Sequence, residues 1–308
     1  MSIDVSIIIP LYNKDRLVYQ TLKSVSQQSY KNWECLIIDD GSTDNSFKVV
    51  KTYIEKHPGN WRIIHQENQG QAVARNNGIA NATGNFLAFL DADDLWSPDK
   101  LTNQVAALIK NPNAAVVLSA YAIFGGDNNA LRLVRHQSPK RMLMGWLDMS
   151  GFGGGLESVG LVRKTALKKI GVFDTNLSTS SGLDLCLRLS KQGEIVLLPE
   201  VGLFYRLNPG QWHSNTKELT RNLAIIQERF SDEYHGNLPR SHSSYLFWAS
   251  SRQKGRKYMM IELWKSLLHP SNGRTVMFIC LVSRNLKSVV MGRLEGRKLR
   301  EILLALEQ

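Results

Sequence analysis

The first 125 residues alternate between short, β-branched apolar runs and stretches with helical spacing of apolar side chains, and this alternation constrains the fold most. The runs are nearly continuous, as in strands of a parallel sheet covered on both faces. Strands are expected at 5–9, 35–38, 62–64, 86–90 and 115–118. Helices are expected around 17–25, 47–54, 72–82 and 101–109. Strands and helices that alternate in this way predict a doubly wound α/β domain.

Polar residues follow three of these strands. In a doubly wound sheet, ligands bind beyond the carboxyl ends of the strands. The side chains at these ends that can contact a ligand are Tyr12, Asn13, Asp39, Asp40, Asp91 and Asp93. We therefore expect one acid-rich site at this edge of the sheet.

The sequence Asp91-Ala92-Asp93 places two carboxylates one residue apart, directly after an apolar strand. Carboxylate oxygens suit Mg²⁺ and Mn²⁺, which keep positions free for phosphate oxygens. An isolated Asp-x-Asp is usually a solvated turn that caps the next helix. Its position at a strand end favours a metal site here.

Residues 70–78 begin with glycine and contain Arg75, so they predict a helix whose N-terminus faces an anion such as a diphosphate. A surface arginine on a capped helix is the alternative. Asp40 precedes a Gly-Ser turn and can also accept a hydrogen bond from a base imide. Neither a Gly-x-Gly-x-x-Gly nor a Gly-Lys-Ser/Thr loop is present, which excludes a dinucleotide-binding Rossmann site and a P-loop NTPase.

Four segments together resemble the family 2 glycosyltransferases with a GT-A fold. They are VSIIIPLYN (5–13), LIIDDGS (36–42), GQAVARNNG (70–78) and FLAFLDADDLW (86–96), in the order and spacing of that family. The resemblance covers roughly residues 1–210 and implies a doubly wound mixed sheet. It further implies transfer of one sugar, with inversion, from a nucleotide-diphosphate sugar, a UDP-sugar before others, in bacterial surface glycan assembly.

The resemblance also implies roles for individual residues. The expected sugar-donor site consists of Pro10, Tyr12, Asn13, Asp40, Arg75, Asp91, Ala92 and Asp93. The first four would surround the nucleobase, and Arg75 would approach the base or the diphosphate. Asp91 and Asp93 would bind Mn²⁺ or Mg²⁺. Trp96 would either lie near the sugar or acceptor, or anchor the core.

The expected general base is missing. Relatives carry a Glu-Asp-x-Asp-Leu element whose first Asp deprotonates the acceptor, and that position is Gly182 here. Asp184 can replace it through a shifted register, or can instead pair with Arg188 as a structural group. Glu157 and Asp174 are further candidates. A fourth possibility is a chain that binds the sugar donor with little or no turnover, because loss of a general base costs about 10²–10⁴-fold in rate. Transfer gained by Gly182→Asp would indicate such a chain.

Residues 208–214 resemble the lid that follows the last core strand in many relatives. His213 is the candidate third metal ligand there, and Trp212 would cover the sugar donor or acceptor. A solvated histidine is the alternative. No Gln-x-x-Arg-Trp element and no series of spanning segments is present, which favours transfer of single sugars over polymerisation.

The charge of +11 is uneven, because residues 211–308 carry 16 Lys/Arg against 8 Asp/Glu. This region is expected to form a basic helical appendage after a domain at 1–210. Its amphipathic helices favour contact with an anionic membrane surface or a lipid-linked glycan acceptor. Acidic strand ends argue against nucleic acid as the partner. A metal-dependent nucleotidyltransferase, which would release pyrophosphate, stays an alternative.

Three scattered cysteines show no disulfide or zinc spacing, and no leader sequence is recognisable. The longest apolar run near the C-terminus, 276–282, is far shorter than the ~20 residues that span a bilayer. We expect a cytoplasmic protein, with peripheral contact on the inner face of the cell membrane.

Overall fold

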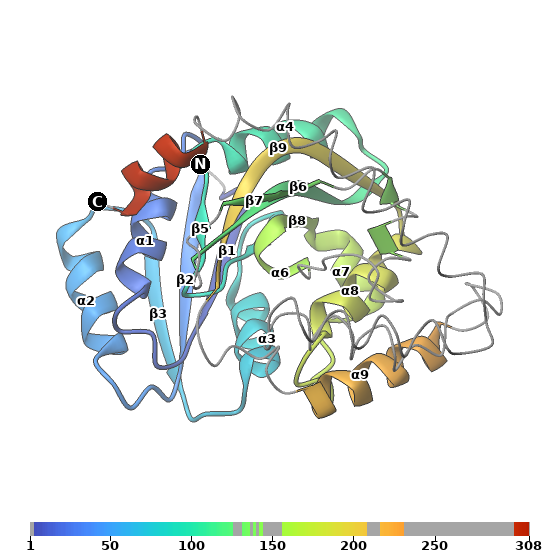
Figure 1. Ribbon diagram of the computed structural model, residues 1–308, viewed down its shortest axis with the longest axis horizontal. Helices are drawn as coiled ribbons and strands as arrows, with labels where there is room; N and C mark the ends of the chain where they lie inside the picture. Colours follow the sequence, from blue (N-terminus) through green and yellow to red (C-terminus); the bar gives the residue numbers. More distant parts are fainter. Residues whose placement is uncertain are drawn as a thin grey trace, which may run out of the picture.

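The computed structural model describes residues 3–125, 131–135, 138–139, 142–143, 156–207, 216–230 and 299–307 of the 308 residues. A sheet of strands in the order β3-β2-β1-β4-β8-β6-β9-β5 runs through these residues, and β7 pairs with β6 beside it. Helices lie on both faces of the sheet (Figure 1). The expected doubly wound mixed α/β fold is confirmed.

The strands are β1 (Val5–Leu11), β2 (Trp33–Asp40), β3 (Trp61–Gln66), β4 (Phe86–Phe89), β5 (Leu95–Trp96), β6 (Ala114–Gly125), β7 (Arg132–Val134), β8 (Gly160–Arg163) and β9 (Glu194–Leu207). The helices are α1 (Val18–Ser26), α2 (Ser46–Lys56), α3 (Gln71–Asn81), α4 (Lys100–Lys110), α6 (Leu156–Val159), α7 (Lys164–Ile170), α8 (Ser181–Ser190) and α9 (Thr216–Arg229). Residues 299–307 are also helical. The apolar runs at 195–197 and 203–205 are both parts of the single strand β9.

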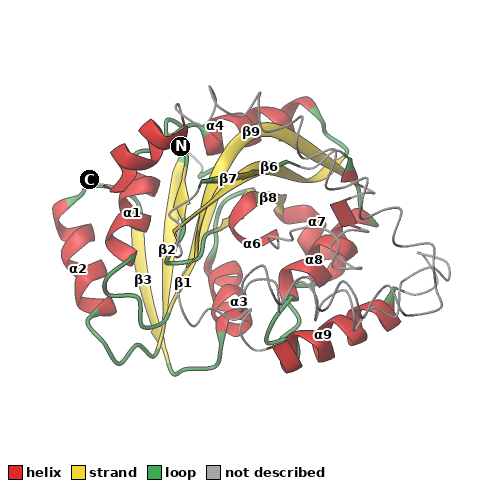
Figure 2. Ribbon diagram, viewed as in Figure 1, coloured by secondary structure: helices red, strands yellow, loops and turns green. Residues whose placement is uncertain are grey.

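Strands β3, β2, β1 and β4 are mutually parallel and are called the parallel half. Every residue of β1 and β2 is buried, because α1 and α2 cover one side and α3 the other (Figure 2). Their continuous apolar sequences follow from burial on both faces. The parallel register brings the carboxyl ends of β1, β2 and β4 to the same edge.

Strands β8, β6 and β9 are called the mixed half. Strand β8 runs antiparallel to both β4 and β6, whereas β6 and β9 are parallel to each other over most of their length. Shifts in register interrupt the β6–β9 pairing near Ser119 and Ala120. The short helix α6 directly precedes β8, so it lies where the two halves meet.

Helix α3 packs unusually close to the sheet. A β-carbon on Gly78 would lie nearer to the side chain of Ile8 than the 3.0 Å at which real β-carbons stop. Because Ile8 is fully buried and β-branched, it has no room to move aside. Glycine at position 78 therefore sets how deeply α3, and Arg75 on it, sits against β1.

Two segments beyond residue 210 pack on the sheet domain. Helix α9 contributes Leu219 and Ile226 to the main hydrophobic core. Residues 299–307 place Leu303 and Leu306 in a second cluster with Phe204 of β9. Most of the basic helical appendage expected after residue 210 lies outside the described residues. Within the part of the chain that the structure describes, no helix is long and apolar enough to cross a membrane.

Candidate functional site

The loop after β1 is tied to the loop after β2 through Asn13. Its Oδ1 accepts the backbone N–H of Thr43 at 2.8 Å, and its Nδ2 donates to the Thr43 hydroxyl at 3.2 Å. Asn13 has a positive φ of 49°, which asparagine tolerates better than most residues. Tyr12 beside it is 46% exposed and free to stack on a ligand, whereas Pro10 is buried within β1. The structure thus brings the two expected nucleobase loops together.

Asp40 organises the turn that leads into α3. Its carboxylate accepts the backbone N–H groups of Gln69 and Gly70, both at 2.9 Å, and the side-chain amide of Gln66 at 2.7 Å. It is only 3% exposed. Its neighbour Asp39 lies 2.7 Å from Nδ1 of His65. Both carboxylates are therefore engaged within the protein, so the turn rather than Asp40 alone shapes the expected base pocket.

Arg75 lies between two carboxylates. Its Nη2 donates to Oδ1 of Asp91 at 2.7 Å, and its Nη1 lies 3.5 Å from Oε1 of Glu157. The guanidinium also stacks over Phe173, with its central carbon 5.3 Å from the ring centroid. Arg75 is 2% exposed, so it acts on a ligand through Asp91 rather than as an open cationic surface.

Asp91 keeps more contact with solvent than Arg75 does. Its side chain is 23% exposed, and Oδ1 also accepts the amide of Gln71 at 2.9 Å. Oδ2 of Asp93 accepts a hydrogen bond from Nζ of Lys14 at 2.7 Å. Ala92 between them is buried, and its carbonyl accepts the hydroxyl of Thr21. The two carboxylates are thus each matched with a protein cation.

Asp94 is buried behind this pair and holds the end of β9. Its Oδ1 accepts the backbone N–H of Arg206 at 3.0 Å. Burial, together with the negative charges of Asp93 and Asp91, raises the pKa of Asp94 well above its ordinary value. The guanidinium of Arg206 donates in turn to the carbonyl of Asp93. This arrangement fixes the main chain around the Asp-x-Asp element.

The residues fit a divalent cation, although the described residues contain no group of three or more His, Cys, Asp or Glu side chains that could hold a metal ion by themselves. Asp91 and Asp93 supply two hard oxygen donors, and phosphate and water oxygens can complete an octahedral shell. The cation would compete with Lys14, whose side chain is 33% exposed and has room to withdraw. His213 lies outside the described residues.

Trp96 is a core residue. It is fully buried, and its Nε1–H donates to the carbonyl of Ser158 at 2.9 Å. Of the two roles considered for it, the structure shows the core anchor. The hydroxyl of Ser158 accepts the backbone N–H of Asp91 at 3.2 Å. Ser158 therefore connects α6 to the Asp-x-Asp turn.

Glu157, the neighbour of Ser158, points toward the start of α8. Its Oε1 accepts the backbone N–H of Gly182 at 2.9 Å, and its side chain is 15% exposed. Burial, with a smaller contribution from the charge of Asp91, raises the pKa of Glu157, although nearby Arg75 acts against this. A β-carbon on Gly182 would overlap the carboxylate of Glu157.

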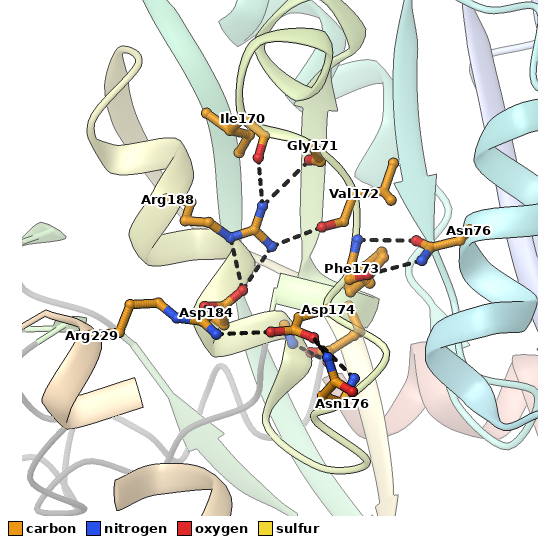
Figure 3. A network of polar contacts seen from close by, with 12 residues as sticks. Asn76, Ile170, Gly171, Val172, Phe173, Asp174, Asn176, Asp184, Arg188 and Arg229 are labelled. Carbon is orange, nitrogen blue, oxygen red and sulfur yellow. Dashed lines mark hydrogen bonds and ion pairs between the residues drawn. The ribbon is translucent and has the colours of Figure 1, made fainter. Parts of the chain in front are cut away.

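Asp184 occupies a different environment from Glu157. It is fully buried and paired with two arginines, Arg188 at 2.7 Å and Arg229 (Figure 3). Arg188 also donates to the carbonyl of Val172, and Arg229 pairs with Asp174 at 2.9 Å. Asp184 shows the structural pairing that was one of its two expected roles, and this geometry does not favour it as the base. Asp174 is engaged in the same network.

Comparison with known proteins agrees with this geometry. The family model "Glycosyl transferase family 2" matches residues 6–171, which is more than half of the chain. The chain belongs to glycosyl transferase family 2. Its fold is that of the GT-A members, and the resemblance inferred from the four segments is confirmed.

Two curated relatives illustrate the sequence similarity within family 2. The UDP-Glc:alpha-D-GlcNAc-diphosphoundecaprenol beta-1,3-glucosyltransferase WfgD of Escherichia coli is 39% identical over 129 residues, which are 41% of this chain and 48% of WfgD. The putative teichuronic acid biosynthesis glycosyltransferase TuaG of Bacillus subtilis is 37% identical over 128 residues, which are 41% of this chain and 50% of TuaG. The chain thus spans about half or less of the curated relatives it matches.

Two solved structures share the fold. The structure of S. aureus TarS 1-349 in complex with UDP-GlcNAc aligns over 82% of this chain and 74% of its own, with a TM-score of 0.59 and 20% identity. The mannosyltransferase PcManGT from Pyrobaculum calidifontis, in complex with GDP-Man and Mn²⁺, aligns over 98% of this chain and 85% of its own, with a TM-score of 0.59 and 18% identity.

Several polar residues of this family 2 site were missed from the sequence. Lys14, His65, Gln71 and Arg206 all contact an acidic residue at the strand ends. Lys14 follows Asn13 directly and Gln71 opens the Arg75 helix, so their position in the motifs was an available signal. His65 and Arg206 are distant in sequence, and only the pairing of β3 with β2 and of β9 with β5 brings them close.

Proposed function

We propose that this chain transfers one sugar from a nucleotide-diphosphate sugar to an acceptor hydroxyl, with inversion at the anomeric carbon. The observation that carries the proposal is the position of Asp91 and Asp93 at the end of β4, beside the joined loops of β1 and β2. Similarity to WfgD and TarS, whose names give UDP-Glc and UDP-GlcNAc, favours a UDP-sugar. Similarity to WfgD and TuaG favours a glycan or lipid-linked glycan acceptor in cell-surface glycan assembly.

The described side chains have distinct roles in this proposal. Tyr12 and the Asn13 loop hold the nucleobase against the turn fixed by Asp40, with Pro10 supporting it from within β1. Asp91 and Asp93 hold Mn²⁺ or Mg²⁺, with His213 as the proposed third ligand. Arg75 orients Asp91. When bound, the cation stabilises the charge that develops on the departing diphosphate.

The proposed location is the cytoplasm, with the basic C-terminal region against the inner face of the membrane and no role for nucleic acid. The charge of residues 211–308 supports this part of the proposal. Most of that region lies outside the described residues. A lipid-linked acceptor would place the reaction at the same surface.

A donor screen tests the proposal. The chain is incubated with Mn²⁺ and a panel of UDP- and GDP-sugars, including UDP-Glc and UDP-GlcNAc, together with short alkyl glycosides as acceptors. We expect acceptor-dependent release of the nucleoside diphosphate and retention of the sugar on the acceptor. Release of pyrophosphate instead would identify a nucleotidyltransferase.

The Asp93→Ala variant tests the assigned site. Because Asp93 holds the cation, we expect loss of Mn²⁺-dependent donor binding and a fall in transfer of about 10³-fold, equivalent to several kcal/mol of lost charge stabilisation. The matched control is Asp99→Ala, which removes an exposed carboxylate beyond the site. Unchanged donor binding in Asp93→Ala would exclude this site.

A second candidate is a chain that binds the sugar donor without turnover. Gly182 favours it, since glycine cannot accept a proton. Tight, metal-dependent donor binding without nucleoside diphosphate release, over the full acceptor panel, would establish this alternative.

A further inference from the structure

The carboxylate of Glu157 lies where a side chain at position 182 was expected. Family resemblance puts a base carboxylate at position 182, at the start of α8, but this chain has glycine there. The carboxylate of Glu157 fills the space that the β-carbon of residue 182 would take. A carboxylate is therefore present within one side-chain length of the expected position, supplied by α6 instead of α8.

Contacts on Glu157 hold its side chain without closing it off. Oε1 accepts the backbone N–H of Gly182 at 2.9 Å and lies 3.5 Å from Arg75. Both of these contacts fall on Oε1, the backbone N–H of Glu157 itself also interacts with the carboxylate, and the side chain is 15% exposed. Oε2 is the atom left to face an acceptor hydroxyl.

Glu157 is also connected to the expected leaving-group side of the site. Arg75 bridges Glu157 and Asp91, and the hydroxyl of Ser158 accepts the backbone N–H of Asp91. These contacts fix the base and the proposed metal ligand relative to each other. The competing carboxylate, Asp184, is fully buried between Arg188 and Arg229 and has no exposed surface for a substrate.

We propose that Glu157 is the general base of the transfer reaction and that Gly182 leaves the space for its carboxylate. This inference rests on the proposed function. Oε2 of Glu157 takes the proton of the acceptor hydroxyl as the hydroxyl oxygen forms its bond to the anomeric carbon. The bond from that carbon to the diphosphate breaks, and the nucleoside diphosphate leaves with the electron pair. Glu157 then returns the proton to water.

This arrangement changes the meaning of a single Gly182→Asp substitution. The new β-carbon would overlap the Glu157 carboxylate, so this variant loses activity even if an aspartate at 182 is a competent base. The informative set is therefore Glu157→Gln, Glu157→Ala, Gly182→Asp and the Glu157→Ala/Gly182→Asp double variant. Glu194→Gln, at an exposed position of β9, serves as the matched control.

We expect Glu157→Gln to lower kcat by about 10²–10⁴-fold, since glutamine keeps the shape and the Gly182 contact but cannot take the proton. The dissociation constant for UDP-Glc or UDP-GlcNAc with Mn²⁺, whichever serves as donor, should stay within about twofold. Glu157→Ala should be similarly slow, and the double variant should recover at least about tenfold relative to it.

Two outcomes overturn the inference. The first is a Glu157→Gln variant with unchanged kcat; a raised donor KM in that variant would make Glu157 a positioning residue for Arg75. The second is a double variant no faster than Glu157→Ala. A wild-type chain that binds the donor but transfers to no acceptor would instead overturn the proposed function and this inference together.

Discussion

The parallel half and the mixed half of the sheet build their polar groups in different ways. In the parallel half, each polar side chain expected at the site lies at or shortly after the end of a strand, so the register of β1, β2 and β4 brings Asn13, Asp40 and Asp91 to the same edge of the sheet. Where the two halves meet, Glu157 and Gly182 are in contact although they are 25 residues apart and come from two helices. The first arrangement can be predicted from local sequence, whereas the second depends on tertiary packing.

The same contrast separates the two carboxylates at the start of α8. Asp184 is fully buried and forms ion pairs with two arginines, so its contacts are those of a structural residue (Figure 3). Glu157 accepts the backbone N–H of Gly182, interacts with its own backbone N–H and lies 3.5 Å from one guanidinium. The exposed fraction separates the two carboxylates, because Asp184 is fully buried whereas the Glu157 side chain is 15% exposed.

Asp184→Asn would give the largest loss of stability. Because the variant leaves Arg188 and Arg229 without a buried counter-charge, we expect the free energy of unfolding to fall by about 3 kcal/mol, near the lower end for a broken buried pair. Arg229 stays 38% exposed, which limits the loss. Urea denaturation measures it, with Asp174→Asn as the control for the outer pair. A stable Asp184→Asn protein that has lost transfer would identify Asp184 as the base.

Gly78→Ala would show how far the parallel half depends on the depth of α3. Alanine gains about 1 kcal/mol in helix propensity, but overpacking against Ile8 costs about 1–3 kcal/mol. We expect a net loss of stability and weaker sugar-donor binding, because α3 carries Arg75. Calorimetric unfolding and donor titration measure the two effects.

The control for this helix is Gly171→Ala. Gly171 has a positive φ of 84° with an extended ψ, but open space around it, so alanine there tests backbone strain alone, about 1–3 kcal/mol. Donor affinity should not change in this variant. Equal loss of donor affinity in both variants would show that the depth of α3 is not the cause.

Glu34 lies at the end of β2 opposite the site. Its substitution should change the free energy of unfolding least among these predictions. Although burial alone would raise its pKa, hydrogen bonds from Thr83 and Ser6 and the charge of Arg62 lower it below the ordinary value. Folding lowers the pKa of this carboxyl, so its ionised form stabilises the fold at pH values above the unfolded pKa of about 4.3. The stabilisation is about 1.4 kcal/mol for each pH unit by which the folded pKa lies below the unfolded one. This contribution is lost as the pH falls through the folded pKa.

We therefore expect the free energy of unfolding of the wild type to decrease between about pH 5 and pH 3 more steeply than that of Glu34→Gln. Urea titrations at several pH values measure the difference. Glu55→Gln, at an exposed position on α2, is the control and should follow the wild type. Parallel curves for Glu34→Gln and wild type would remove Glu34 as a source of acid sensitivity.

The sequence predicted the parallel half well because apolar runs, turn residues and the Asp-x-Asp element are local signals. It did not predict that Asp40 would be occupied by three donors of its own chain, since Gln66, Gln69 and Gly70 reach it only after β3 pairs with β2. It identified Gly182 as a departure from the family pattern. It could not show that the carboxylate of Glu157 fills that place, because no sequence spacing reports contact between α6 and α8.

Ser158 has a consequence for how such a protein can change over evolution. Its carbonyl accepts a hydrogen bond from the indole N–H of Trp96 in the core, and its hydroxyl accepts one from the backbone N–H of Asp91. One residue beside Glu157 therefore connects the buried core to the turn after β4. In the proposed reaction, these hydrogen bonds would set the separation between the leaving group and the attacking hydroxyl. We expect loops around this frame to exchange one acceptor preference for another while that separation stays constant.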